Sequence, residues 1–326
     1  MKKYFIIIMI ALVLLISGCG KREDSKIDLP NPYEGSEGLV VEFIEGAPPD
    51  EVLMSRGGVG NDFPIAVRIR NNGAVDVDNY WFALAVEEPK LSVSGSHEDF
   101  GGNLVGKETS ISGGMTVIET TATAQPIERD PEEDAVEVKK LSAAITATIC
   151  YNYKTKHSAS VCLDAEPYRL NPGEDVCEMA PEDFVNQGAP VAITRVEPSV
   201  VESNGNILPR FKIFVKNIGT GLIVNTGAAP YNAEGVCAGT TFTRENKVFN
   251  YMSSISARIG NTYLDCGPPT LKLTDDDANN FFLCEAGPSL AILRGRGSFT
   301  TELALELNYG YTESISKVIS IQELIE

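Results

Sequence analysis

Two nine-residue segments, residues 65–73 (IAVRIRNNG) and residues 211–219 (FKIFVKNIG), align without a gap and decide the fold. Every second residue at the start of both segments is apolar, which is the pattern of a β-strand with one buried face. Both segments end in Asn-x-Gly, a sequence that favours a tight turn. A second pair of segments, residues 149–153 (ICYNY) and residues 307–311 (LNYGY), recurs in the same order. The sequence therefore predicts two similar β units in tandem.

The rest of the chain supports this interpretation. From residue 39 onward, short segments with period-two alternation are separated by turn residues about every 8–12 positions, which is typical of a β-sandwich or barrel. The repeat places two β-sandwich domains at residues 39–168 and 189–326. Residues 169–188 are rich in proline, glycine and acidic residues and are predicted to be a linker. We expect residues 149–153 and 307–311 each to be followed by a turn and a return strand.

A resemblance to a known family adds to this prediction. In each unit the Asn-x-Gly turn precedes a short segment, residues 75–77 (VDV) in the first and residues 222–224 (LIV) in the second. This arrangement resembles the CARDB-type immunoglobulin-like modules of prokaryotic surface proteins. The resemblance implies an all-β chain of two tandem immunoglobulin-like β-sandwich domains that act as adhesive or spacer units. It implies no catalytic residues.

The N-terminus has the layout of a secretory signal peptide. Lys2 and Lys3 precede a nearly uninterrupted apolar run, and small residues then lead to Cys19. Residues 16–19 (ISGC) resemble the lipobox of prokaryotic lipoproteins, bacterial or archaeal. The resemblance implies that residues 1–18 are a signal peptide, that Cys19 is lipid-modified, and that the mature chain is attached to the outer face of the cell membrane.

Two alternatives to lipidation remain open. In the first alternative, the apolar run is an uncleaved anchor, although it is shorter than the roughly 20 residues that a spanning helix needs. In the other it is an ordinary export signal and Cys19 is incidental. All three interpretations place the body of the chain outside the cytoplasm. Residues 19–38 are predicted to be a flexible tether, because Pro30 and Pro32 argue against the alternative of a short helix.

The charge of the chain excludes one class of partner. With 27 Lys+Arg against 45 Asp+Glu, the formal net charge is -18. Nucleic-acid binding depends on clustered Lys and Arg that neutralise phosphates, so no nucleic-acid partner is predicted. The two histidines, His97 and His157, leave little material for a histidine-rich metal site. We expect the partners to be the membrane, through the lipidated N-terminus, and other envelope proteins.

The cysteine count is consistent with export. Six cysteines remain besides Cys19, and an even number in an exported protein suggests three disulfides. The repeat places Cys150 and Cys162 on the two strands of one predicted hairpin. Neither cysteine has a counterpart in the second unit, so we expect these two to pair with each other.

The remaining four cysteines suggest two further disulfides. Cys266 and Cys284 flank a predicted strand–turn–strand segment and are expected to pair across it. Cys177 would then join the linker to Cys237 in the second unit. A metal site is the alternative, but no cysteine pair has the spacing of a zinc site.

One acidic segment partly matches a calcium loop. Asp275, Asp277 and Asn279 occupy the first three ligand positions of an EF-hand-like loop. The sixth position is Asn280 instead of glycine, and Glu285 falls at position eleven instead of twelve. We therefore predict an Asp/Asn-rich turn, with weak calcium binding as the alternative and no cofactor.

The other candidate residues have plainer interpretations. His97 lies among serine and acidic neighbours, but adjacent residues do not form a catalytic triad, and a solvated loop is predicted. Residues 128–134 (ERDPEED) are predicted to be a solvated acidic loop. His157 is expected to be exposed near the turn of the predicted hairpin. Trp81 is predicted to pack in a sandwich core, with a sugar-binding platform as the alternative.

Together these observations favour a non-enzymatic, lipid-anchored surface protein that serves as a structural, spacer or adhesion and assembly module of the envelope. The alternative is a ligand-binding receptor or an accessory subunit of an envelope complex, which would use loops at a sandwich end or an interdomain groove. An enzyme with a site that shows no linear motif is the least favoured possibility.

Overall fold

The computed structural model describes residues 31–55, 60–94, 98–109, 111–126, 140–166, 176–224, 249–252, 254–293 and 297–324 of the chain. From Asn31 onward the chain forms one compact unit. Its described residues are organised almost entirely in β-strands, with two three-residue 3₁₀ helices, η1 (Asp277–Asn279) and η2 (Pro288–Leu290), and no α-helix. The predicted all-β class is confirmed.

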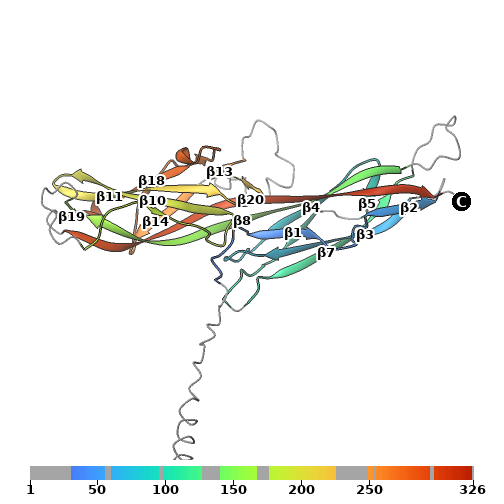
Figure 1. The fold of residues 1–326 in the computed structure, drawn as a ribbon, viewed down its shortest axis with the longest axis horizontal. Helices are drawn as coiled ribbons and strands as arrows, with labels where there is room; N and C mark the ends of the chain where they lie inside the picture. Colours follow the sequence, from blue (N-terminus) through green and yellow to red (C-terminus); the bar gives the residue numbers. More distant parts are fainter. Residues whose placement is uncertain are drawn as a thin grey trace, which may run out of the picture. The chain divides into compact units, whose positions relative to one another are not determined.

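The strands form three main sheets and one small one (Figure 1). The four-stranded sheet contains, in order, β1 (Leu39–Phe43), β3 (Asn61–Asn71), β7 (Met115–Ala124) and β5 (Leu91–Val93). The six-stranded sheet contains β16 (Asp265–Gly267), β18 (Phe281–Glu285), β11 (Asn206–Asn217), β10 (Val191–Ser203) and β9 (Glu182–Asp183), with β19 (Ile292–Leu293) beside β11. The eight-stranded sheet contains β15 (Thr262–Tyr263), β14 (Ser254–Ile259), β20 (Ser298–Leu324), β8 (Lys140–Asp164), β4 (Tyr80–Val86) and β6 (Glu98–Gly101), with β12 (Leu222–Val224) and β2 (Glu51–Ser55) also beside β20. The small sheet pairs β13 (Tyr251–Met252) with β17 (Leu271–Lys272).

Two very long strands, β8 and β20, run through the whole unit. They pair antiparallel without a register shift from Ser298 opposite Asp164 to Gln322 opposite Lys140. At about 3.4 Å per residue, such a ladder is roughly 80 Å long. Ordinary strands have about 3–10 residues, so this ladder is far longer than a single sandwich needs.

The ladder is shared by two sandwich-like halves. In the first half, the four-stranded sheet packs on the part of the ladder that is flanked by β4 and β2 (Figure 1). In the second half, the six-stranded sheet packs on the part that is flanked by β14. One cluster of buried apolar side chains extends through both halves. Each repeat therefore supplies one end of its long strand to the half that contains the other repeat's sheet.

The hairpin that the sequence suggested after residues 149–153 is wrong. Residues 140–164 form the single strand β8, and residues 298–324 likewise form β20 without a turn. The reason is that the period-two alternation never stops. Thr155, Ala159 and Val161 continue the buried face of β8, and polar residues between them occupy its other face.

Four tyrosines mark the point where the two halves meet. Tyr151 lies opposite Tyr311 and Tyr153 lies opposite Tyr309, on either side of the central pair Asn152 and Gly310. Their rings contact one another at centroid distances of 5.7–6.4 Å, mostly edge to face. Burial raises the pKa of Tyr153 and of Tyr311 to about 12, so these hydroxyls stay protonated at neutral pH.

The tyrosine hydroxyls bind equivalent backbone groups in the two repeats. Tyr151 accepts a hydrogen bond from the Leu39 amide (3.0 Å), and Tyr309 accepts one from the Val191 amide (3.3 Å). These amides begin the matching strands β1 and β10. The other two hydroxyls accept bonds at the matching turns, Tyr153 from Val75 (3.3 Å) and Tyr311 from Gly221 (2.8 Å).

The contacts of the tyrosines and the turns explain why Asn and Gly occur in both Asn-x-Gly segments. The buried Asn71 amide donates to the carbonyls of Val75 (2.9 Å) and Leu104 (2.8 Å) and accepts from Gly73 (3.0 Å). Asn217 makes the matching turn bonds in the second repeat. A Cβ on Gly73 would lie only 1.8 Å from the Tyr153 hydroxyl oxygen, so the tyrosine requires glycine there.

The predicted tether and linker both contain residues that pack on the body. The carbonyl of Gly35 accepts a hydrogen bond from the Gly188 amide (3.1 Å), and that of Gly38 accepts one from Asn72 (2.8 Å). In the linker, β9 pairs with β10, and Phe184 packs against the core. The described parts of these segments, residues 31–38 and 176–188, are therefore components of the compact unit.

Replacing the buried asparagine tests the turn directly. Asn71→Ala removes three hydrogen bonds to backbone groups, two of them buried and one part-buried, and we expect the free energy of unfolding to fall by about 3 kcal/mol. The neighbouring Asn72→Ala removes one bond, to Glu37, and should cost less than about 1 kcal/mol. Denaturant unfolding followed by Trp81 fluorescence measures both. Equal losses in the two variants would contradict the role given to Asn71.

Candidate functional site

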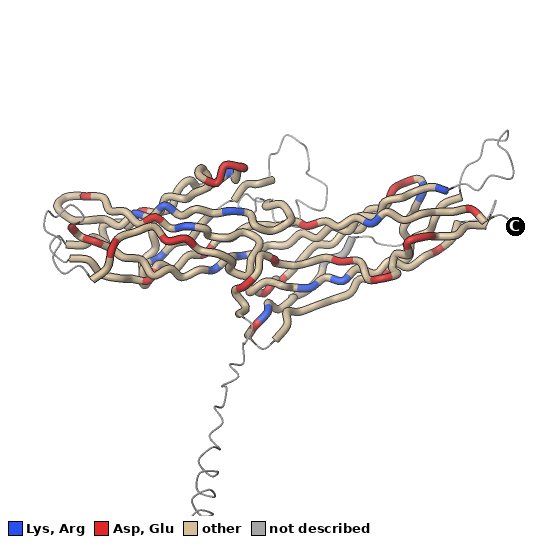
Figure 2. Tube along the Cα trace, in the orientation of Figure 1, with Lys and Arg blue, Asp and Glu red and all other residues tan. Residues whose placement is uncertain are grey.

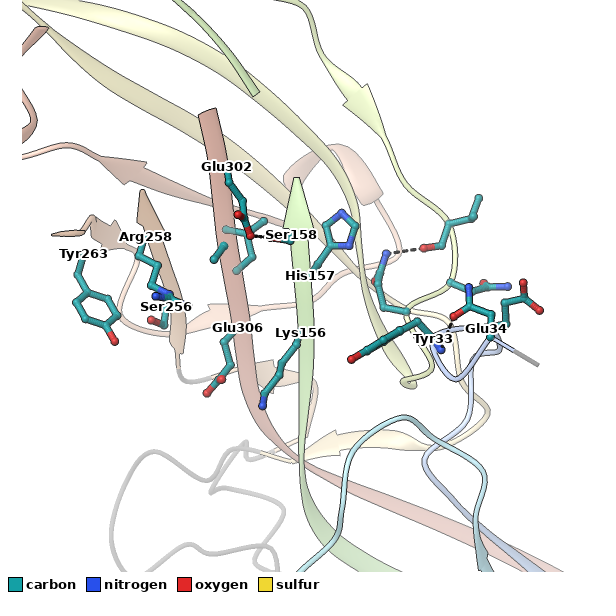
Figure 3. A pocket seen from close by; sticks show the side chains of 16 residues that line it. Tyr33, Glu34, Lys156, His157, Ser158, Ser256, Arg258, Tyr263, Glu302 and Glu306 are labelled. Carbon is teal, nitrogen blue, oxygen red and sulfur yellow. Dashed lines mark hydrogen bonds between the residues drawn. The ribbon is translucent and has the colours of Figure 1, made fainter. Parts of the chain in front are cut away.

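A groove of about 1170 Å³ lies beside β8, β20 and β14 in the second half (Figure 3). Its floor is the sheet, and its far wall comes from two segments that precede the matching first strands of the repeats. The lining residues are Asn31, Tyr33, Glu34, Lys156, His157, Ser158, Val185, Asn186, Gln187, Ser256, Arg258, Tyr263, Glu302, Ala304, Leu305 and Glu306.

The strand register explains how the floor is built. Tyr263 lies opposite Arg258, which lies opposite Ala304, which lies opposite Ser158. Directly opposed residues of antiparallel strands project from the same face, so these four side chains form one row across the sheet. Ala304 is the smallest of them, and it leaves room between the Arg258 and Ser158 side chains.

A second row supplies charges of both signs. Ser256 lies opposite Glu306, which lies opposite Lys156. Glu306 accepts a hydrogen bond from the amide of Asn308 (3.1 Å). Within the described ranges, neither Lys156 nor Arg258 forms an ion pair (Figure 3). The Arg258 guanidinium donates one hydrogen bond, to the carbonyl of Gly260 (3.3 Å), so both cationic groups keep donors for a ligand. The floor thus presents an ammonium, a guanidinium and carboxylates close together.

The far wall is fastened by a buried glutamine. The Gln187 side chain donates to the carbonyl of Ile193 (3.0 Å) and accepts from the amide of the same residue (2.9 Å). It also donates to the carbonyl of Val185, which holds the wall segment in a tight curve. In the neighbouring segment of the same wall, the backbone amide of Tyr33 donates to the Asn31 side chain (3.1 Å). The sequence placed these residues in a linker and a tether, and so missed the wall.

His157 is not exposed as the sequence suggested. It lies in the interior of β8, and its ring contacts the ring of Phe184 at a centroid distance of 4.3 Å. Its Nε2 atom is buried and finds no hydrogen-bond partner among the described residues. Burial lowers the pKa of the imidazole from its ordinary value of 6.5, because a charged ring would lose its hydration.

Ser158 and His157 are neighbours in the sequence, but they do not form a pair of nucleophile and base. Ser158 donates to the carboxylate of Glu302, whereas the adjacent His157 projects toward the opposite face of the strand. A nucleophile and its base must instead be within hydrogen-bond reach.

Two disulfides join described cysteines, and they correct the predicted pairing. Cys266 and Cys284 are bonded across β16 and β18, as expected. Cys162 is bonded to Cys177, so the predicted pairs of Cys162 with Cys150 and of Cys177 with Cys237 are wrong. Cys150 and Cys162 lie on one extended strand, about 40 Å apart, and cannot meet.

The cysteines also bear on the compartment. Cys150 is disulfide-bonded as well. The bond between Cys162 and Cys177 has a sequence separation of 15, and by loop entropy such a bond contributes about 3 kcal/mol. Disulfides of this kind indicate an oxidising, extracytoplasmic environment.

In the acidic turn that begins at Asp275, the carboxylates of Asp276 and Asp277 contact other groups of the chain. Asp276 caps η1 by accepting from the amide of Ala278 (3.1 Å), and Asp277 forms an ion pair with Lys216 (2.5 Å). Asn279 donates its side-chain amide to Asp276 (2.7 Å). Among the described residues, no group of histidine, cysteine and acidic side chains is arranged to hold a metal ion.

Trp81 is buried, but on a different face from the one predicted. It lies opposite Cys150 and packs with it in a small cluster apart from the main core. Its neighbours Tyr80 and Phe82 fill the core instead. Three other predicted features, Cys19, His97 and residues 128–134, lie outside the described residues, as does Cys237.

The groove residues were hard to find in the sequence. Lys156 and Ser158 alternate with inward-facing residues of β8, and Glu302 and Glu306 do so on β20. Such alternation also describes an ordinary solvated sheet face. The only signal specific to the groove is the pairing register of four strands, which one sequence does not show.

The free energy of unfolding of the chain should depend on the protonation of His157. Because the pKa of His157 is lower in the folded chain than its ordinary value of 6.5, the unfolded chain binds the proton more readily. Stability should therefore fall as the pH drops below about 6.5. We expect the denaturant midpoint of the native chain to fall as the pH is lowered from 7, and the midpoint of the His157→Gln variant to fall by less. Parallel pH profiles would contradict the burial of this ring.

Within the described ranges, no helix has the length and apolar character needed to cross a membrane.

The sequence was compared with known families and with curated proteins. No model of a known protein family matches the chain, and no curated protein is significantly similar to it in sequence.

Proposed function

We propose that this chain is an exported, lipid-anchored protein of the cell envelope that acts as a non-enzymatic spacer or assembly module. One observation carries the proposal: the uninterrupted ladder of β8 and β20 that both halves share. The lipobox-like residues that end at Cys19 support the anchor, and the disulfides support the compartment.

The shared ladder makes the joint between the halves stiff. Two domains joined by a linker move relative to each other unless their interface is large and apolar. Here, bending at Asn152 and Gly310 would break ladder hydrogen bonds and separate the tyrosine rings packed around them. A stiff module of this kind holds whatever it binds at a fixed distance from its anchor.

The immunoglobulin-like character of the two halves belongs to this proposal. Each half packs one sheet on part of the shared ladder, and each repeat begins with a matched strand pair, β1 with β3 and β10 with β11. These features support kinship with CARDB-type modules in which the last strand has been extended into the neighbouring half. Acidic and basic residues are interspersed along the described strands, as on a solvated surface (Figure 2).

Distance measurements between spin labels test the stiffness. Labels carried by unnatural amino acids, which leave the disulfides intact, are placed at the exposed positions Val318 in the first half and Leu293 in the second. We expect a single narrow distance distribution, as narrow as that of a control pair, Val318 and Val117, within the first half. A broad or double distribution for the first pair alone would refute the spacer. Mass spectrometry of the membrane-extracted chain tests the anchor, which an unmodified Cys19 would exclude.

The groove supports a second candidate function, that of a ligand-binding receptor. Its ionic groups of both signs, its hydroxyls and the exposed ring of Tyr263 suit a polar ligand with many hydrogen-bonding groups. Ala304→Trp would fill the floor, and Val318→Trp adds the same ring at an exposed position of the same strand in the other half. If a polar ligand binds the native chain and Val318→Trp but not Ala304→Trp, the result would favour the receptor function.

A further inference from the structure

Exposed apolar side chains gather around the turn that precedes β7. Of the 14 large hydrophobic residues that are exposed in the described ranges, four lie between residues 105 and 117. They include Val105, Ile111 and Met115, with exposed fractions of 48%, 56% and 54%. Single exposed apolar residues are normal, but a group within one short segment suggests a surface that something covers.

The backbone of this turn is held in place, so these side chains cannot withdraw into the core by a local collapse. The Gly114 amide donates to the carbonyl of Val105 (2.8 Å), and the Glu108 amide donates to that of Ile111 (2.9 Å). Lys107 donates its amide to the carbonyl of Gly73 (2.8 Å). The turn is thus tied to the Asn-x-Gly region of the first repeat.

The turn lies beside the first described residues of the chain. The Lys107 ammonium donates to the carbonyl of Glu34, and Pro32 and Tyr33 line a small hollow together with Lys107 and Thr109. Cys19 precedes Asn31 by twelve residues. Twelve residues span at most about 40 Å in any conformation, so a lipid on Cys19 keeps Asn31, and the turn beside it, within reach of the bilayer.

We propose that the described residues of this turn, 104–109 and 111–115, contact the surface of the bilayer to which the chain is anchored, with Ile111 and Val105 entering the boundary between headgroups and acyl chains. This inference rests on the proposed lipid anchor. Weak insertion suffices, because the anchor already confines the protein to the surface and a second membrane signal strengthens the attachment of a single lipid.

The charges around the turn fit this role. Arg70 has its guanidinium 3.9 Å from the Met115 sulfur, and Lys107 belongs to the turn itself. Both are cations next to the apolar side chains, where they can meet lipid phosphates at the headgroup level. Glu108 lies in the same turn and opposes this attraction, so the apolar contacts carry most of the interaction.

A tryptophan placed in the turn tests the contact. The full-length, lipidated variant Ile111→Trp is added to preformed phosphatidylcholine vesicles, either plain or with brominated acyl chains that quench nearby indoles. Val318→Trp, at a position of 64% exposure on β20, is the matched control, and the native chain gives the background of the buried Trp81. Met115→Trp serves as a second probe if Ile111→Trp does not fold.

We expect emission from the Ile111→Trp chain to shift to shorter wavelength on vesicles and to be quenched by the brominated lipid, with no change for Val318→Trp. Co-sedimentation with vesicles and no quenching would leave the anchor standing and overturn the contact. Failure to co-sediment would overturn both the anchor and the contact. Concentration-dependent dimers with an unquenched probe would assign the surface to a second copy of the chain, and would also overturn the contact.

Discussion

The structure depends on the backbone ladder between β8 and β20, and above all on the four tyrosines at its centre. The ladder alone would be a two-stranded ribbon, and an isolated ribbon is barely stable in water. The tyrosines connect it to the rest of the fold, because Tyr151 and Tyr309 fix the first strands of the two repeats, and Tyr153 and Tyr311 fix the following turns. The hydroxyls of Tyr151 and Tyr309 satisfy backbone amides that would otherwise be buried without a partner, and the other two satisfy part-buried amides.

This arrangement links the fold to the proposed function. A repeat that ended in a hairpin would close its own sandwich and leave a linker as the only connection to its neighbour. Here the hairpin is absent, and each long strand continues into the other half. Two elements of the candidate site follow from the same extension. The distal part of β8 forms the floor of the groove with β20 and β14, and the segment around Gln187 forms its wall where the second repeat begins.

Much of the fold was predictable from the sequence, but its connections were not. The alternation at Ile65, Val67 and Ile69 identified β3 correctly, and the matched Asn71 and Asn217 identified equivalent turns. The sequence-based hairpin failed because the polar residues at positions 154–158 resemble a turn, although they alternate between the two faces of a strand: Lys156 and Ser158 lie on its outer face and Thr155 on its buried face. Sequence patterns report which face of a strand is buried, and not where its partner lies. The groove, the half-buried His157 and the pairing of Cys162 with Cys177 all depend on such partners.

The central claim is that the two halves form one cooperative unit because they share two strands. Differential scanning calorimetry of the purified chain tests it most directly, since the ratio of calorimetric to van't Hoff enthalpy counts the cooperative units. The shared ladder predicts one transition with a ratio close to one, although many chains of this length unfold in steps. Two separable transitions, one for each half, would contradict the account.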